Sequence, residues 1–256
     1  MSLRRRCIRM IDSFVSLVLV LAIVLLGSYS AFALWDNKQV YSAAKDVQIK
    51  MQELKPDIEE EEGPSLSQLV SINPDVKGWL TLDGTAIDYP ILQGDTNLTY
   101  INTDVYGHFA LAGSIFMDCR NSGDFSDSYN LIYGHHMANS NMFGDLDLYR
   151  EEAFFQENRT GILMTEGKVY DLQLFAVLVI SASEDQIFEV RAEKDLKSLF
   201  SFIEKEALHQ RELPELKEGT KILALTTCSS DFSDARTIVI AEMKKHFNPS
   251  QEDSEE

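Results

Sequence analysis

The longest apolar stretch of the chain covers residues 14–34 and is interrupted only by Ser16 and by a short segment that starts at Gly27. A run of about 20 apolar residues is long enough to cross a bilayer. Arginines at positions 4, 5, 6 and 9 precede it, and basic flanks of this kind stay on the cytoplasmic side. The pattern therefore predicts a cytoplasmic N-terminus at 1–13, a transmembrane signal-anchor at 14–34 and an extracellular remainder.

A cleaved secretory signal is the alternative interpretation of the same stretch. Residues 15–26 would be its apolar core, and Ala31, Phe32 and Ala33 have the small-x-small form that a signal peptidase recognises. The rest of the chain is exported under either interpretation, and we favour the anchor.

The next segment, residues 35–63, is predominantly polar. Apolar residues recur at helical spacing at positions 40, 44, 47 and 51, which predicts a short amphipathic helix outside the membrane. Four consecutive glutamates at 59–62 and the Gly63-Pro64 pair that follows are typical of a solvated linker. Residues 248–256 are again acidic and predict a disordered tail, so the folded domain should cover residues 64–247.

Within that domain, apolar and β-branched runs alternate with turn residues. Asp83-Gly84 and Glu166-Gly167 are hairpin signals between neighbouring runs. Short strands in this arrangement favour a closed antiparallel barrel or a sandwich over a doubly wound sheet. The eight predicted strands are residues 78–82, 87–92, 114–117, 130–133, 161–165, 168–181, 221–227 and 236–242.

Helical spacing also occurs inside the domain. Apolar residues from position 195 to 207 predict a helix in the long connection between the sixth and seventh strands. Residues 142–149 predict a shorter helix, and residues 65–70 predict a helical entry into the domain.

Charge and cysteine content narrow the function classes. The 256 residues carry a formal charge of −18, with 41 acidic and 23 basic side chains, which would repel nucleic acid. The three cysteines, Cys7, Cys119 and Cys228, are too few and too scattered for a disulfide framework or a zinc site. We expect no Cys119–Cys228 disulfide.

The segment from 221 to 242 contains the strongest candidate chemistry. Cys228 directly follows one predicted strand and Arg236 begins the next after a short polar loop, so antiparallel pairing would bring them to one end of a sheet. A nearby cation favours the nucleophilic thiolate and can donate to an oxyanion. Alone, however, Cys228 would more often be a small buried residue, and Arg236 could merely pair with Asp234.

A candidate base lies at the end of the fourth predicted strand, where residues 133–137 read Tyr-Gly-His-His-Met. His135 could also be a loop residue, or His135 and His136 could be half of a metal site. Neighbours on a strand point to opposite faces, and no further cluster of ligands completes such a site. The pattern therefore favours a base over a metal ligand.

Together these motifs resemble the sortases, cysteine transpeptidases of the bacterial envelope, and most closely their class B. The likeness rests on Tyr-Gly-His-His-Met at 133–137, Leu-Thr-Thr-Cys ending at Cys228, an arginine eight positions later, and the segment 72–80, which is similar to the entry into the family's first strand. It covers roughly residues 66 to 243. The resemblance selects an eight-stranded sortase-type β-barrel with an N-terminal helix, and a helix between the sixth and seventh strands marks class B.

The resemblance also implies roles for individual residues. His135, Cys228 and Arg236 match the catalytic positions, with His136 as the reserve for the base. Candidate substrate-binding residues are Asn97, Tyr100, Thr226, Thr227 and Ile187.

The implied reaction is a two-step transfer without metal or organic cofactor. The cysteine attacks the carbonyl after a threonine in a C-terminal sorting signal of a secreted protein, and the thioacyl enzyme passes to an amine of a peptidoglycan precursor or a pilin lysine. Two rival functions remain: an envelope cysteine peptidase that hydrolyses the same intermediate, and a non-catalytic, membrane-tethered binding protein. The order of histidine before cysteine is opposite to that of papain-like enzymes, which disfavours the peptidase.

Overall fold

The computed structural model describes residues 3–58, 64–191, 194–228 and 234–247, with backbone alone for residues 3–8 and for residue 228. By its internal contacts the chain divides into two units, Met1–Ala43 and Ala44–Glu256.

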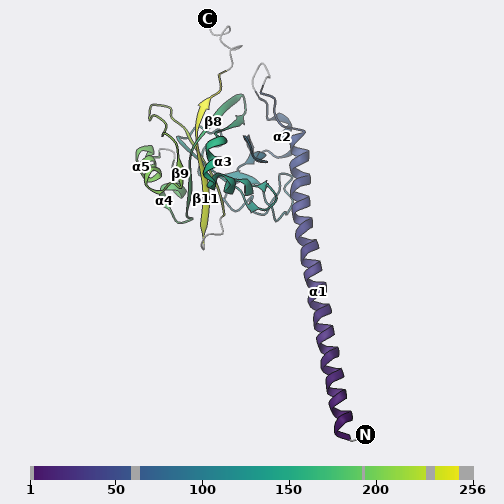
Figure 1. Ribbon diagram of the computed structural model, residues 1–256. Helices are drawn as coiled ribbons and strands as arrows, with labels where there is room; N and C mark the ends of the chain where they lie inside the picture. Colours follow the sequence, from purple (N-terminus) through teal and green to yellow (C-terminus); the bar gives the residue numbers. More distant parts are fainter. Residues whose placement is uncertain (1–2, 59–63, 192–193, 229–233, 248–256) are drawn as a thin grey trace. The chain divides into compact units, whose positions relative to one another are not determined.

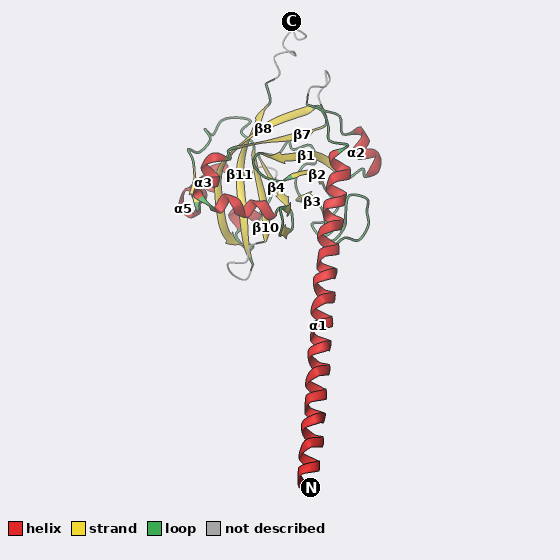
Figure 2. Ribbon diagram, turned by 45° about the vertical axis from the view of Figure 1, so that its right-hand side comes forward, coloured by secondary structure: helices red, strands yellow, loops and turns green. Residues whose placement is uncertain are grey.

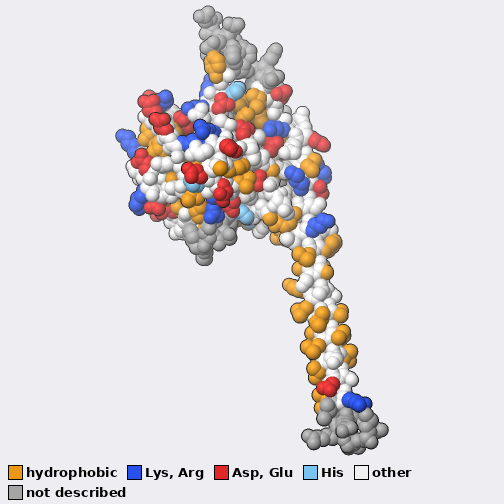
Figure 3. All heavy atoms as spheres, viewed as in Figure 1, with side chains coloured by type: hydrophobic (Ala, Val, Ile, Leu, Met, Phe, Trp, Pro, Cys, Tyr) orange, Lys and Arg blue, Asp and Glu red, His pale blue; other side chains and the backbone are white. Residues whose placement is uncertain are grey.

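The N-terminal unit is helical. Helix α1 (Leu3–Gln52) is continuous from the apolar run into the polar segment, and its last turns from Ala44 belong to the second unit. The short amphipathic helix predicted from the apolar positions 40–51 is thus the continuation of α1, because neither proline nor glycine interrupts the chain between the two segments. Apolar side chains cover the N-terminal part of α1 (Figure 3), and it is long and apolar enough to cross a membrane.

The second unit is a β-barrel (Figures 1 and 2). In the described part of the chain, eight strands close in the order β11-β10-β4-β3-β2-β1-β7-β8, and β8 pairs with β11 to complete the ring. Each contains or overlaps one of the eight predicted strands, which confirms the predicted barrel. The strands are β1 (Val76–Leu82), β2 (Asp88–Leu92), β3 (Ile115–Met117), β4 (Tyr129–Tyr133), β7 (Thr160–Thr165), β8 (Lys168–Ser181), β10 (Ile222–Cys228) and β11 (Ala235–Lys245). Shorter strands are β5 (His136–Met137), β6 (Asn141–Met142) and β9 (His209–Gln210).

The barrel is not wholly antiparallel, contrary to the prediction. β4 runs parallel to β10, and β2 runs parallel to β3. Hydrophobic periodicity identifies a strand but not its neighbour, and β10 pairs with a strand about ninety residues earlier in the chain. This parallel pair is what brings the two candidate motifs together.

Helices lie around the barrel (Figure 2). They are α2 (Ser67–Ile72), the 3-10 helix η1 (Gly144–Arg150), α3 (Glu152–Glu157), α4 (Asp185–Phe188) and α5 (Leu196–Glu206). The predicted helix at 195–207 is α5, and Asp195 caps its N-terminus: the Asp195 carboxylate accepts hydrogen bonds from backbone N–H groups of the first turn. The helix predicted at 142–149 corresponds to η1.

Three apolar clusters of described residues stabilise this arrangement. The barrel interior contains Leu80, Leu225 and Val239. The outer face of β10 and β11 packs against α4 and α5, and the outer face of β1 packs against α2 on another side of the barrel (Figure 1). Each buried aliphatic side chain contributes about 1.5–3 kcal/mol from the hydrophobic effect.

Candidate active site

The pairing of β10 with β11 brings two of the predicted catalytic residues together. Cys228 is the last residue of β10 and is the register partner of Arg236. Residues directly opposite each other in an antiparallel pair lie on the same face of the sheet. The backbone of Cys228 is therefore level with Arg236 at the end of this pair, while the cysteine side chain itself lies outside the described part of the chain.

The parallel pairing of β4 with β10 brings the third residue to the same place. Tyr133 is level with Thr226, and the backbone N–H of Gly134 donates to the Thr226 carbonyl at 3.1 Å. The paired register ends at Tyr133, and beyond Gly134 the side chain of His135 lines a cleft together with Thr226 and Arg236. The strand pairings and this shared cleft thus place the three predicted catalytic residues at one edge of the barrel.

Gly134 allows the chain to leave β4 at this point. A Cβ atom on this residue would lie 2.5 Å from Ile115 and 2.7 Å from the ring of Phe143. Only glycine permits such a close approach of backbone to side chains. The backbone then turns, and the imidazole Nε2 of His135 lies 2.7 Å from the carbonyl oxygen of Ile101. Because a carbonyl only accepts hydrogen bonds, Nε2 carries a proton, and Nδ1 is the ring nitrogen that remains available to accept or donate a proton.

A cleft of about 350 Å³ opens at this edge of the barrel. Its walls are mainly apolar, with a few polar groups, which is the usual composition of a ligand-binding site. The described residues that line it are Asn97, Leu98, Ile101, Phe116, Arg120, Tyr133, Gly134, His135, Ala182, Phe188, Thr226, Thr227 and Arg236.

The predicted substrate-binding residues divide into two groups. Asn97, Thr226 and Thr227 line the cleft. Tyr100 does not, because its ring is buried and its hydroxyl donates to Asp75 at 2.7 Å. Ile187, within α4, is fully buried, and the residue of this helix that lines the cleft is Phe188.

The hydroxyl of Thr226 has no hydrogen-bond partner among the described residues, although the residue is almost fully buried. A buried polar group without a partner costs about 1–3 kcal/mol. Thr226 lines the cleft, so a bound ligand could supply that partner.

The sequence interpretation missed a polar network beside the cleft. The Asp118 carboxylate, whose side chain is 0% exposed, accepts hydrogen bonds from Arg120, Asn97 and Tyr133 at 2.7–2.9 Å. Burial alone would raise the pKa of Asp118, but these hydrogen bonds outweigh burial and lower the pKa below its ordinary value. The available signal was an acidic residue directly after an apolar strand, with an arginine two positions later.

The second histidine makes different contacts. His136 is 39% exposed, and its Nε2 lies 2.9 Å from a carboxylate oxygen of Asp147 in η1. The other oxygen of Asp147 accepts a hydrogen bond from the hydroxyl of Thr237 at 2.6 Å. His136 is therefore tied to the η1 side of the barrel, and it does not line the cleft.

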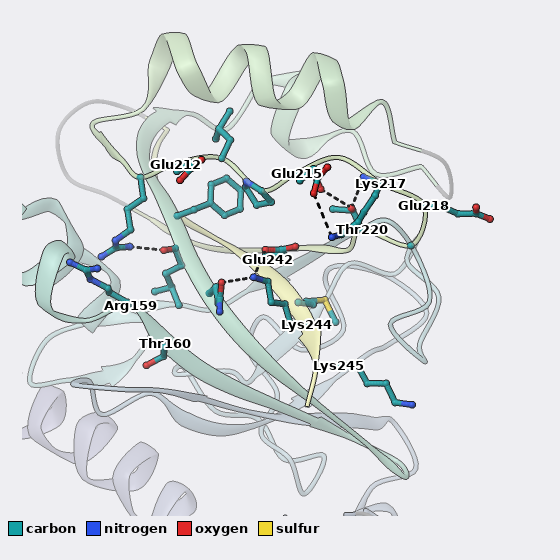
Figure 4. A pocket seen from close by; sticks show the side chains of 18 residues that line it. Arg159, Thr160, Glu212, Glu215, Lys217, Glu218, Thr220, Glu242, Lys244 and Lys245 are labelled. Carbon is teal, nitrogen blue, oxygen red and sulfur yellow. Dashed lines mark hydrogen bonds and ion pairs between the residues drawn. The ribbon is translucent and has the colours of Figure 1, made fainter. Parts of the chain in front are cut away.

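A larger hollow, of about 1140 Å³, lies between residues 211–220 and the strands β8 and β11 (Figure 4). Lysines and glutamates line it, and several of them already pair with one another: Lys217 lies 3.7 Å from Glu215, and Lys244 lies 3.3 Å from Glu242. The residues lining it include none of the predicted catalytic residues. Size alone therefore does not identify the candidate site, because the smaller cleft is the one lined by the predicted catalytic residues His135 and Arg236.

Metal binding finds no support in the described parts of the chain, which contain no group of three or more histidine, cysteine or carboxylate side chains able to hold an ion. The thiol of Cys119 is free.

Comparison with known proteins agrees with this geometry. Residues 80–244 match the Sortase domain family. Sortase B of Listeria monocytogenes is 30% identical over 177 residues, which cover 68% of this chain and 72% of that protein. Among solved structures, a Streptococcus pyogenes class B sortase involved in pilus biogenesis is 35% identical, with a TM-score of 0.64 over 70% of this chain and 97% of that chain. The Staphylococcus aureus sortase B–substrate complex is 25% identical, with a TM-score of 0.65 over 81% of this chain and 95% of that chain.

Proposed function

Because the chain belongs to the sortase family, and within it to class B of these cysteine transpeptidases, we propose that it cleaves the C-terminal sorting signal of secreted proteins after a threonine and joins them to an amine. The observation that carries the proposal is that Cys228 is the register partner of Arg236, and that His135 and Arg236 line one cleft. The Staphylococcus aureus sortase B–substrate complex supports, by analogy, the binding of a substrate by this fold.

In the first step, the Cys228 thiolate attacks the carbonyl carbon of the threonine at the scissile bond. Arg236, together with backbone N–H groups, donates hydrogen bonds to the oxyanion that forms. Protonated His135 gives a proton to the departing amine as the C–N bond breaks. A thioester between Cys228 and the threonine carbonyl remains.

In the second step, the acceptor amine attacks the thioester. Neutral His135 takes the amine proton through Nδ1, because Nε2 is held by the Ile101 carbonyl. The C–S bond breaks, the thiolate is regenerated and an amide bond forms. We propose a peptidoglycan stem or cross-bridge as the acceptor; the pilus role of the Streptococcus pyogenes relative supports a pilin lysine as the alternative.

The reaction is tested with a fluorogenic sorting peptide, with and without an added amine. Amine-dependent product supports transfer, hydrolysis alone would indicate a peptidase, and an unchanged peptide would indicate a binding protein. Cys228→Ala should abolish turnover, and Cys119→Ala is the matched control that should leave turnover unchanged, because that thiol does not line the cleft.

We further propose that residues 14–34 of α1 anchor the enzyme in the cell membrane with the barrel outside. The exposed apolar side chains of this segment and the arginines before it support this topology. The full chain expressed in a bacterium should sediment with membranes and keep its first residues. Release of a soluble form that begins after Ala33 would show instead that the segment is a cleaved signal.

A further inference from the structure

The carboxylate of Asp118 accepts hydrogen bonds from several side chains and takes part in none of the proposed catalytic steps. It follows β3 directly, is fully buried and binds the guanidinium of Arg120 through two parallel hydrogen bonds, from Nε at 2.8 Å and from the terminal nitrogen at 2.7 Å. Bidentate pairs of this kind fix the orientation of an arginine as well as its position. Arg120 therefore has a defined direction although its side chain is 47% exposed.

Arg120 points this fixed guanidinium at α4. The same terminal nitrogen donates to the backbone carbonyl of Phe188 at 2.9 Å. The preceding carbonyl, that of Ile187, accepts a hydrogen bond from the hydroxyl of Tyr129 at 2.9 Å. Two successive carbonyls at the end of α4 are thus held from the barrel side.

The segment held in this way forms a wall of the cleft. The side chain of Phe188 lines it, as do Arg120 itself and Asn97 and Tyr133, the two other side chains that bind Asp118. One buried carboxylate consequently positions groups from the β2–β3 connection, from β4 and, through Arg120, from α4. Within the described part of the chain, Arg236 and His135 form no hydrogen bond with this network: Arg236 donates to the Ala235 carbonyl, and His135 contacts the Ile101 carbonyl.

We infer that Asp118 and Arg120 form a clamp that sets the position of the α4 wall, and that Arg120 is thereby a specificity-determining residue for the peptide. Asp118 is a positioning residue that acts through Arg120. This inference rests on the proposed function for its ligand, a sorting peptide, but the clamp itself is a property of the fold and can be tested without any substrate.

The first experiment measures backbone hydrogen exchange of the full chain in Arg120→Gln. Loss of the bond to the Phe188 carbonyl should let α4 open more often, so exchange at residues 185–189 should rise about tenfold. Arg191→Gln is the matched control: it removes an exposed arginine that pairs with Glu189 next to α4 but does not line the cleft, and exchange should change less than about twofold. Unchanged exchange in Arg120→Gln would overturn the clamp, whatever the activity.

The second experiment measures turnover of the sorting peptide. Arg120→Gln should raise KM about tenfold with kcat within about threefold of wild type, because the catalytic groups keep their bonds. Alkylation of Cys228 by a small haloacetamide should proceed at the wild-type rate, since that reagent does not need the α4 wall. Arg120→Lys should not restore KM, because an ammonium cannot reproduce the planar fork.

A role in fold stability alone would give a different result: a lower Tm and a smaller active fraction, with KM unchanged. Faster exchange with unchanged KM would therefore overturn the assignment of specificity. If the wild-type protein turns over no sorting peptide, the proposed function fails, whereas the exchange measurement still decides the clamp.

Discussion

Two adjacent histidines follow β4, and their side chains lie in two regions with different chemistry, the cleft and the side of the barrel next to η1. On the cleft side, His135 is half-buried and lies near Arg236 and the Asp118 network. On the other side, His136 is exposed and binds Asp147, which in turn binds Thr237. Because neighbours on a strand face opposite ways, Arg236 faces the cleft and Thr237 faces η1.

The two carboxylates show why these regions differ. Asp118 is 0% exposed, so each donor it lost would leave a buried charge unsatisfied. Asp147 is 30% exposed, and water can replace either of its partners. Removal of the aspartate carboxylate should therefore lower the stability of the fold more at position 118 than at position 147.

The largest expected difference is between the two histidines. His135→Ala should lower kcat/KM by about 10²–10⁴-fold, the usual contribution of a general acid–base, with little change in Tm. His136→Ala should stay within a few-fold of wild type. Steady-state kinetics with a sorting peptide measure both, and an inactive His136→Ala beside an active His135→Ala would reverse our assignment of the base.

The second difference is between the two carboxylates. Asp118→Asn should lower the free energy of unfolding by about 2–4 kcal/mol, because it leaves Arg120 without its buried counter-ion. Asp147→Asn should cost less than about 1 kcal/mol. Urea unfolding of both variants measures this comparison, and equal losses would contradict it.

The stabilisation by Asp118 should depend on pH in a defined direction. Its pKa is lowered in the folded state, so its contribution is fully present above the ordinary aspartate pKa of about 4 and decreases as pH falls through the lower folded value. The stability gap between wild type and Asp118→Asn should therefore be constant near neutral pH and close only in strong acid. A gap that closed between pH 5 and 7 would be inconsistent with the lowered pKa.

A smaller difference is expected between two threonines that are register partners on β10 and β11. Thr237→Val removes a hydroxyl that donates to Asp147, and should cost about 1 kcal/mol of unfolding free energy. Thr227→Val removes a buried hydroxyl that has no partner among the described residues, so it should be neutral or stabilising. Thermal unfolding of the two variants compares them directly.

The smallest effect concerns the ion pair on the exposed side of the turn. A double-mutant cycle of His136→Ala and Asp147→Ala should give a coupling free energy of about 0.2–1 kcal/mol, and less at high salt. A coupling that exceeded 2 kcal/mol and did not respond to salt would mean that this region is as tightly organised as the cleft side.

The sequence was informative about the secondary-structure elements and about the residues that lie near Cys228. All eight barrel strands, the helix α5 and the hairpin that joins Cys228 to Arg236 follow from local periodicity and turn residues. It was less informative about Ile187, where the wall residue is one position further along the chain. A shift of one residue turns a side chain by about 100° around a helix, and the periodicity of a four-residue helix is too short to settle which residue faces the cleft.

The sequence by itself therefore determined which segments are strands, which residue types carry the chemistry, and the family to which the chain belongs, since these depend on local pattern and on motifs. Only the tertiary structure decided that β10 pairs in parallel with β4, that Asp118 gathers the cleft wall, and that His135 and His136 serve different sides of one turn. Those outcomes depend on contacts between residues far apart in the chain, and hydrophobic patterning assigns a residue to a face without specifying what it meets there.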